Sequence, residues 1–308
     1  MSDRPPVSLV LTSRRRLLAA GGALASVVSL AACGRPDAAP ETDAPTEDPA
    51  VGPPEGSLEW AIEGPWRAGD RARDEWRHPL ETLRFFGLQP NMRVVEFWPG
   101  SGWYTEILAP YLARGGGKLY AAGFPVGPGS DPAQAALNTA YQSRFSADRR
   151  LYGEIEFTSF GPSSGPVAPA GTADLVLFMR TIHAWMAAGI VEKAFADAFA
   201  ALRPGGVLGV EQHRLSPDAD QDPAAANGYV QEAFVQQVAA EAGFAFVAAS
   251  DVNANERDTK DHPFGVDTLP PISLTARPGE PPDPTFDRAR YLAIGESDRM
   301  TLRFRKPE

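Results

Sequence analysis

Short apolar segments alternate with amphipathic segments along most of the chain after residue 57. The first of them, residues 94–97, reads Val-Val-Glu-Phe and is typical of a buried strand in a parallel sheet. The same kind of pattern predicts further strands over residues 118–122, 154–160 and 174–179, within 202–210, and over 244–249 and 299–304. Strands that alternate with helices predict a mostly parallel sheet with helices on both faces.

The helices are predicted from apolar positions that share one face. Residues 71–86 carry such a stripe, and we expect His78-Pro79 to interrupt this helix. Another helix is expected to begin at Ser101 or Gly102, directly after the first strand. Further helices are predicted over residues 131–148, 191–202 and 229–242.

A glycine turn after the first strand organises the predicted domain. Gly100 and Gly102 can adopt backbone angles that a Cβ disfavours, and they allow a ligand to approach the main chain. Free N–H groups at the start of the next helix would face that ligand. Ligands of open α/β sheets bind at the carboxyl ends of strands, so the sequence predicts a binding site at this turn.

Residues 1–33 have the pattern of an export signal, in which a basic patch, Arg14-Arg15-Arg16, precedes a short apolar run. Cys33 directly follows Leu-Ala-Ala, which resembles a bacterial lipoprotein signal and implies a membrane anchor through a lipid on Cys33. An ordinary cleaved signal is the alternative. The Ser-Arg-Arg-x-Leu-Leu pattern resembles a twin-arginine signal, with a plain basic region as the alternative. We therefore expect a periplasmic or cell-envelope location.

Composition divides and constrains the rest of the chain. Residues 34–56 are rich in Pro, Ala, Asp, Glu and Thr, which predicts a disordered tether, and 57–308 are long enough for one domain with its own core. The net charge of -10 argues against nucleic-acid binding. The single cysteine excludes an internal disulfide, and the four histidines show no paired ligand spacing, so no metal site is predicted.

The order of these elements carries a resemblance. A strand ending in Glu96-x-x-x-Gly100-x-Gly102, a helix, a strand opening at Asp174, and Leu-Arg-Pro-Gly-Gly-Val-Leu over 202–208 resemble class I S-adenosylmethionine-dependent methyltransferases. More narrowly, the chain is similar to a group of exported bacterial predicted methyltransferases that share features like 85–88, 98–108 and 295–300. The resemblance implies a Rossmann-like sandwich with strand order 3-2-1-4-5-7-6, strand 7 antiparallel, and S-adenosyl-L-methionine as the cofactor.

The resemblance also implies cofactor contacts. Glu96 would accept from the amino group of the methionine part, and the two glycines of the turn would let that part lie against the backbone. The chain departs from the wider superfamily at Trp98, where a glycine is usual, and at Gly123-Phe124, where an acidic residue commonly binds the ribose. The cofactor-binding residues that we predict are Glu96, Trp98, Gly100, Gly102, Trp103, Gly123, Phe124 and Arg180.

Candidate catalytic groups follow the fourth and fifth strands. His183 is the first choice as general base because it would lie at the rim of the sheet and titrate near neutrality, and a structural hydrogen bond is its alternative. Glu211 and His213 are further candidates. Arg180 either binds an anionic acceptor or pairs with Glu96 or another carboxylate.

Aromatic and polar segments near the site have simpler interpretations. Trp103, Tyr104 and Trp185 either shape an apolar acceptor pocket or pack in the core. Residues 253–267 are expected to form a lid or a surface loop, with Asp258 in a solvated charge cluster. Residues 295–299 are expected to form a turn that is ion-paired near the pocket.

The predicted function is methyl transfer from S-adenosyl-L-methionine to a small-molecule or envelope-component acceptor. An alternative is a catalytically inactive envelope lipoprotein of the same fold that acts as a binding module, which Trp98 and Gly123 favour. A nicotinamide-dependent oxidoreductase is disfavoured, because Thr105 stands where the third glycine of Gly-x-Gly-x-x-Gly would be.

Overall fold

The computed structural model describes residues 52–308, except 129 and 278. The predicted signal (1–33) and nearly all of the predicted tether (34–56) lie outside these residues, so both stay predictions. The described residues belong to one compact unit, Pro49–Glu308. None of its described helices is both long and apolar enough to cross a membrane.

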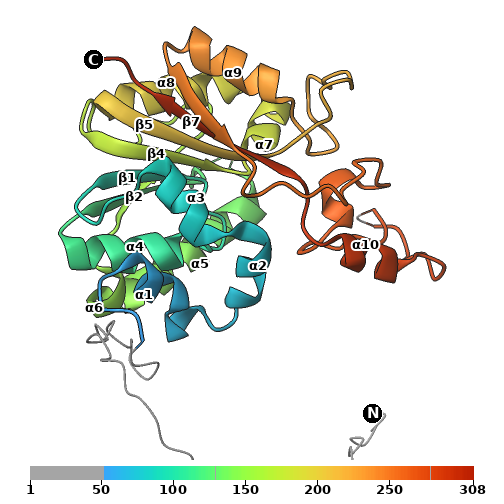
Figure 1. Cartoon of the computed structure of the whole chain (residues 1–308), viewed down its shortest axis with the longest axis horizontal. Helices are drawn as coiled ribbons and strands as arrows, with labels where there is room; N and C mark the ends of the chain where they lie inside the picture. Colours follow the sequence, from blue (N-terminus) through green and yellow to red (C-terminus); the bar gives the residue numbers. More distant parts are fainter. Residues whose placement is uncertain (1–51, 129, 278) are drawn as a thin grey trace, which may run out of the picture. The chain divides into compact units, whose positions relative to one another are not determined.

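Seven strands form one sheet in the order β3-β2-β1-β4-β5-β7-β6 (Figure 1). The first five strands run parallel to one another, and β7 runs antiparallel to its neighbours β5 and β6. This arrangement confirms the predicted fold class, including the antiparallel seventh strand. The strands are β1 (Arg93–Phe97), β2 (Lys118–Gly123), β3 (Glu156–Ser159), β4 (Ala173–Met179), β5 (Leu202–His213), β6 (Ala245–Ser250) and β7 (Arg299–Arg305).

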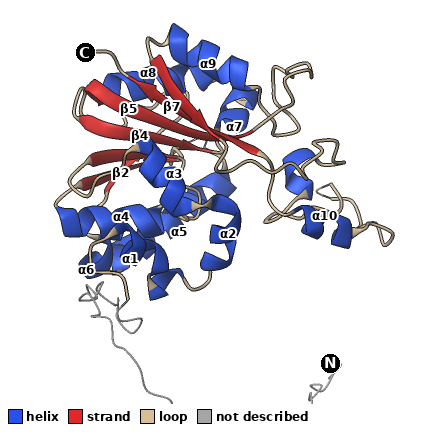
Figure 2. Cartoon of the chain, viewed as in Figure 1, coloured by secondary structure: helices blue, strands red, loops and turns tan. Residues whose placement is uncertain are grey.

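Helices cover both faces of the sheet, as predicted (Figure 2). Alternate residues of β1 point to opposite faces: Val94 packs in one buried cluster and Val95 in the other. The Val94 face carries α1 (Leu58–Glu63), α3 (Pro79–Phe86), α4 (Thr105–Gly115), α5 (Pro132–Ala147) and α6 (Arg149–Tyr152). The Val95 face carries α7 (Ile182–Ala187), α8 (Val191–Ala201) and α9 (Glu232–Glu241).

The segment before β1 is broken where the sequence predicts. A short helical turn, η2 (Arg71–Arg73), leads into α2 (Asp74–Arg77), and α3 starts at Pro79. His78 lies between them in the left-handed region, with φ 38°. This break separates α2 from α3. Arg77, at the end of α2, lies near residues at the carboxyl edge of the sheet.

The predicted start of the helix after β1 is wrong. The helix α4 begins at Thr105, and residues 101–104 form turns. Gly100 and Gly102 have φ values of 61° and 94°, which no right-handed helix accommodates. The glycine turn is therefore longer than predicted and lies open above β1.

The apolar pattern did not predict every element. Examples are η1 (Pro65–Arg67), which precedes β1, and η3 (Gly265–Thr268) and α10 (Arg288–Ile294), which follow β6. The predicted solvated cluster around Asp258 is also wrong, because Asp258 is 3% exposed. Its carboxylate accepts from Tyr229 Oη at 2.9 Å, from the backbone N–H of Asp298 at 2.8 Å, and contacts His262 Nε2 at 2.8 Å. These bonds attach the 253–262 segment to the turn before β7.

Candidate active site

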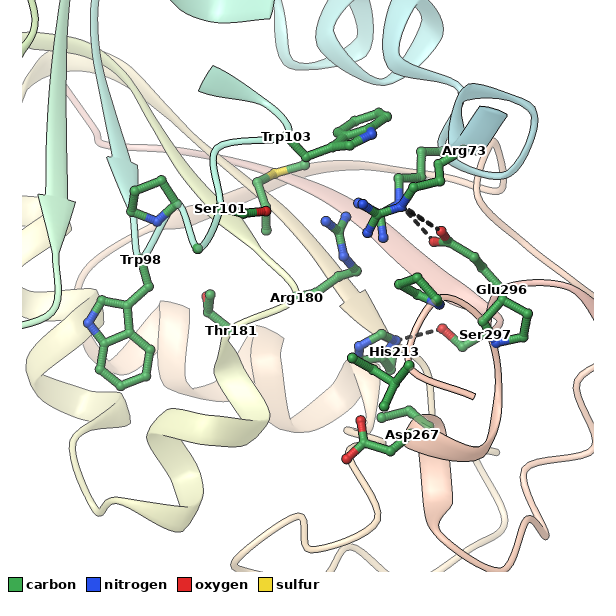
Figure 3. Close-up of a pocket in the computed structure, with 18 residues that line it drawn as sticks. Arg73, Trp98, Ser101, Trp103, Arg180, Thr181, His213, Asp267, Glu296 and Ser297 are labelled. Carbon is green, nitrogen blue, oxygen red and sulfur yellow. Dashed lines mark hydrogen bonds and ion pairs between the residues drawn. The ribbon is translucent and has the colours of Figure 1, made fainter. Parts of the chain in front are cut away.

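A cavity of about 280 Å³ opens where strands β1, β4 and β5 end and β7 begins (Figure 3). The turn after β1 forms one wall, and arginines from η2, α2 and the end of β4 form the facing wall. The η3 segment and the residues after it form a third, mostly apolar wall. The lining residues are Arg73, Arg77, Trp98–Ser101, Trp103, Met179–Thr181, His213, Val266, Asp267, Pro270–Ile272, Glu296 and Ser297.

The two glycines of the turn have different roles. A Cβ added to Gly100 would have no atom within 4 Å, and Gly100 lines the cavity. A Cβ added to Gly102 would lie 2.3 Å from the ring of Phe145, and Gly102 is buried. Gly100 therefore keeps the main chain open to a ligand, whereas Gly102 allows α5 to pack against the turn.

Trp98, at a position where the family resemblance leads us to expect glycine, has a backbone conformation that suits glycine, with φ 43°. Its Nε1 donates to the carbonyl oxygen of Phe160 at 2.9 Å, and its ring centroid lies 4.6 Å from that of Phe124. Trp98 lines both the main cavity and a second cavity of about 400 Å³, whose wall includes Asp131 and Gly161. The indole therefore stands at the boundary between the two cavities.

The end of β2 has no room for the acidic side chain that is usual there. A Cβ at Gly123 would lie 2.1 Å from Oδ1 of Asn138, which projects from α5. The side chain of Asn138 therefore occupies the space that a carboxylate side chain at position 123 would need. Gly123 and Phe124 are not among the residues that line the two cavities.

Glu96 lies beneath the turn rather than on the cavity wall. Its position in β1 places it on the same face as Val94, under α4 and α5, where it is 2% exposed. Its Oε2 accepts from Thr105 Oγ1 at 2.7 Å, and Thr105 Oγ1 lies 3.0 Å from Tyr141 Oη. Burial raises the pKa of Glu96 to about 7, although the Thr105 hydrogen bond opposes this shift.

Glu211, at the end of β5, pairs with two arginines. Its Oε1 lies 2.8 Å from Arg180 Nη1 and 3.0 Å from Arg299 Nη1, and its Oε2 accepts from Tyr104 Oη at 2.8 Å. Burial alone would raise the pKa of Glu211, but Arg180, Arg299 and Arg77 together lower it to about 2. Glu211 is therefore an anion at neutral pH, and its contacts show that it orients Arg180.

Glu296, in the turn before β7, is another buried carboxylate. Arg77 Nε lies 2.8 and 3.0 Å from its two oxygens, and Arg299 Nη1 lies 3.0 Å from Oε2. This confirms the predicted ion pairing of residues 295–299 near the pocket. Burial, and then repulsion from Arg180, lower the pKa of Arg77 to about 9 despite its pairing with Glu296.

The two candidate histidines lie side by side, with ring centroids 5.4 Å apart. His213 lines the cavity, and its Nδ1 is 2.6 Å from Ser297 Oγ. His183 is not among the lining residues, and its Nδ1 is 3.2 Å from Gln212 Nε2. Burial lowers the pKa of both, and for His213 the neighbouring His183 and Arg180 lower it further. Both rings are therefore neutral at pH 7.

Of the three aromatic candidates, one lines the cavity and two are buried in the interior. Trp103 lines the cavity, with the guanidinium carbon of Arg77 4.8 Å from its ring centroid. Tyr104 is buried behind it, and Trp185 is fully buried in the core against Phe178 and Phe97. Core packing is thus the correct interpretation for Trp185.

The predicted residues fall into two groups. Those that line the cavity are Trp98, Gly100, Trp103, Arg180 and His213, and those that do not are Glu96, Gly102, Gly123, Phe124, His183 and Glu211. Arg73, Arg77 and Asp267 also line the cavity but lie outside the motifs, and Thr181, which directly follows Arg180, was not among the predicted site residues. Among the residues that the structure describes, no group of three or more His, Cys, Asp or Glu side chains is arranged to hold a metal ion.

Comparison with known proteins finds similarity only among solved structures. No protein-family model matches the chain. No curated protein matches it either. A SAM-dependent methyltransferase from Aquifex aeolicus is 19% identical, with 61% of this chain and 90% of that chain covered and a TM-score of 0.47. The [4+2]-cyclase SpnF is 16% identical, with 75% and 80% covered and a TM-score of 0.47. A SAM-dependent methyltransferase from Methanosarcina mazei is 11% identical, with 73% and 96% covered and a TM-score of 0.44. Identities this low do not transfer a function.

Proposed function

We propose that this chain is an S-adenosyl-L-methionine-dependent methyltransferase whose acceptor binds in the cavity beside Gly100. The observation that carries the proposal is the position of the open glycine turn. It lies at the carboxyl end of β1, next to β4, where the strand order reverses direction, and ligands of open α/β sheets bind at this crevice. The same strand order with an antiparallel β7 is what the family resemblance implies.

The residues at the turn fit the cofactor in part. Gly100 leaves the main chain open to the cavity, and Ser101 and Thr181 add hydroxyl groups on either side. Trp98 and the Asn138–Gly123 contact remove two features that the superfamily commonly uses for the adenosine part. We therefore assign the methionine part to Gly100 and Ser101, with Trp98 at its side.

When bound, S-adenosyl-L-methionine supplies a methyl group on a positively charged sulfur, and transfer leaves the electron pair of the broken C–S bond on a neutral thioether. The chain's part is to position the acceptor and accept its hydrogen bonds. In the tautomer in which His213 Nδ1 donates to Ser297 Oγ, Nε2 is an acceptor on a ring that lines the cavity. The low pKa of His213 keeps the ring neutral, so Nε2 can orient an acceptor hydroxyl or amine.

Calorimetric titration with S-adenosylmethionine and S-adenosylhomocysteine tests the proposal. We expect micromolar binding that Gly100→Gln weakens at least about tenfold, because the new side chain enters the cavity. Gly116→Gln is the matched control: Gly116 also has a positive φ, 75°, and open space around it, but it ends α4 away from the cavity. If the folded protein binds neither compound at millimolar concentration, the proposed methyltransferase function is refuted.

We further propose that the protein is exported and anchored to the cell envelope through a lipid on Cys33. Support comes from the basic patch, the apolar run and the position of Cys33 after Leu-Ala-Ala. Mass spectrometry of the mature N-terminal peptide tests this. We expect a diacylglyceryl-modified Cys33, and an unmodified N-terminus at another residue would contradict it.

A binding module without methyl transfer is the second candidate. Its support is Trp98, whose indole stands between the two cavities and narrows any path from one to the other. This candidate predicts that small ligands bind in the main cavity while S-adenosylhomocysteine does not. The same titrations therefore distinguish the two functions.

A further inference from the structure

We infer that the methyl acceptor carries an oxyanion, a carboxylate or a phosphate, that binds the guanidinium groups of Arg73, Arg77 and Arg180 in the main cavity. The anion site follows from the geometry of these side chains, and only its assignment to the acceptor rests on the proposed methyltransferase function. The sequence suggests an anionic acceptor only for Arg180, whereas Arg73 and Arg77, from η2 and α2, lie outside every predicted motif.

The arginines bring unused hydrogen-bond donors to the cavity. Arg77 is 3% exposed, and only its Nε is bound, to Glu296. Its Nη1 and Nη2 make no hydrogen bond to any described residue. Arg180 uses Nη1 for Glu211, which leaves Nη2 without a partner in the described part of the chain. Arg73 Nε and Arg77 Nε lie 3.5 and 2.8 Å from oxygens of Glu296, and both side chains line the same cavity as Arg180 (Figure 3), so these donors converge on one space.

The charges around this space are unequal. Four arginines, Arg73, Arg77, Arg180 and Arg299, contact three carboxylates, those of Glu211, Glu296 and Asp70. One positive charge in this partly buried cluster is therefore left without a counter-ion. Asp267 also lines the cavity, but no ion pair joins it to any of the four arginines. A buried charge without a partner is unfavourable, and burial, followed by repulsion from Arg180, lowers the pKa of Arg77. A bound anion would relieve it.

A second, independent observation lies beside Arg180. The side-chain hydroxyl of Thr181 is buried, the residue being 8% exposed, and it has no hydrogen-bond partner among the described residues. Thr181 lines the same cavity and projects into it between Trp98 and Arg180 (Figure 3). A buried hydroxyl is normally hydrogen-bonded, so its isolation indicates a place where a ligand oxygen accepts its proton.

The position of the cluster in the sheet favours the acceptor over the cofactor as the source of the anion. Arg180 follows β4, its partner Glu211 ends β5, and Glu296 precedes β7, so the cluster extends away from β2. The second cavity, beyond Trp98, lies on the β2 and β3 side of the turn. A cofactor across Gly100 would thus lie between the second cavity and the arginines. The apolar wall of Val266 and Pro270–Ile272 suits a short hydrocarbon body attached to the anion.

Calorimetry on the full-length protein tests the site with butyrate and its neutral analogue butyramide, which share a carbon skeleton and differ in charge. Titrations are made at constant ionic strength, with and without saturating S-adenosylhomocysteine, and inorganic phosphate is titrated in parallel. We expect butyrate to bind at least about tenfold more tightly than butyramide. We also expect its affinity to be the same with and without S-adenosylhomocysteine. Comparison with phosphate identifies the preferred oxyanion.

Variants locate the binding. Arg73→Gln and Thr181→Val should each weaken butyrate binding, the first by about tenfold, and leave butyramide binding unchanged. Arg71→Gln is the matched control, because Arg71 belongs to the same short helical turn, is exposed and does not line the cavity. It should bind butyrate as the unchanged protein does. The Arg73 partner Asp70 is partly exposed. The other partner, buried Glu296, keeps its ion pairs with Arg77 and Arg299, so the substitution of Arg73 leaves no buried carboxylate unpaired.

Two results would overturn the inference. The first is equal affinity for butyrate and butyramide in the folded protein. The second is displacement of butyrate by S-adenosylhomocysteine, which would assign the arginines to the cofactor's own carboxylate. If butyrate binds but S-adenosylhomocysteine does not, the anion site is supported and methyl transfer is not. Failure of one proposal can therefore be distinguished from failure of the other.

Discussion

The buried carboxyl of Glu96 allows a quantitative prediction about stability. Its pKa is raised from 4.5 in the unfolded chain to about 7 in the folded protein, mainly by burial. Below pH 4.5 both states hold the proton and Glu96 contributes nothing to the pH dependence. Between pH 4.5 and 7 the unfolded chain releases the proton while the folded protein keeps it, so stability falls as the pH rises. Each pH unit in this window costs about 1.4 kcal/mol, which amounts to about 3 kcal/mol by pH 7.

Glu96→Gln removes this titration and keeps the shape of the side chain. Its Oε1 can still accept from Thr105 Oγ1. We therefore expect the stability of Glu96→Gln relative to the unchanged protein to rise by about 3 kcal/mol between pH 4.5 and 7.5. Urea unfolding followed by tryptophan fluorescence at four pH values in this range measures the difference, and the slope of the difference against pH is the diagnostic quantity.

The comparison between variants isolates Glu96 from other titrating groups. Neutral, partly buried His183 and His213 also contribute to the pH dependence, but they contribute equally in both proteins. Glu192→Gln on the exposed side of α8 is the matched control, and its stability difference should stay within about 0.5 kcal/mol across the range. If the Glu96→Gln difference is the same at pH 5 and pH 7.5, the carboxyl is not held protonated and our account of the turn is wrong.

Three further substitutions test the packing and charges around the site. Gly102→Ala should lower the free energy of unfolding in urea by about 2–4 kcal/mol, because its Cβ would lie 2.3 Å from Phe145 at φ 94°, whereas Gly116→Ala has open space and should lose about 1 kcal/mol. Glu211→Gln removes the carboxylate that pairs with Arg180 and Arg299, and should lower the free energy of unfolding by about 3–5 kcal/mol. An unchanged midpoint of urea unfolding would contradict these ion pairs. Trp98→Gly joins the two cavities, and calorimetry should show S-adenosylhomocysteine binding about tenfold more tightly if the indole blocks the path.

The strands were predictable because each consists of a short apolar run bounded by turn residues. The pattern at 174–179, for example, coincides with β4 except for one residue at its start. The strand order came from the family resemblance and not from periodicity. The start of α4 was predicted too early because Ser and Gly are common residues at the start of a helix, and the positive φ values of Gly100 and Gly102 delay the helix.

The site itself was less predictable than the fold. Motif positions located the turn, but the facing wall depends on pairs far apart in sequence, such as Arg77 with Glu296. No local pattern indicates such pairing. Asp258 was misjudged for the same reason, since its partners Tyr229 and Asp298 lie 29 and 40 residues away. A charged residue in a polar segment is usually solvated, and only long-range hydrogen bonds make its burial favourable.

Trp98 is where the two candidate functions diverge. A tryptophan with φ 43° costs about 1 kcal/mol of backbone strain that glycine would avoid, so the side chain must contribute something to be stable there. Its hydrogen bond to Phe160 and its contact with Phe124 hold the ring at the boundary of the two cavities. If the ring stacks on a ligand, Trp98→Gly should weaken S-adenosylhomocysteine binding; if the ring closes the path, the same change should strengthen it. A tryptophan that only closes the path would leave the arginine-lined cavity as the working site of a binding module, whereas a stacking tryptophan joins both cavities into one site for methyl transfer.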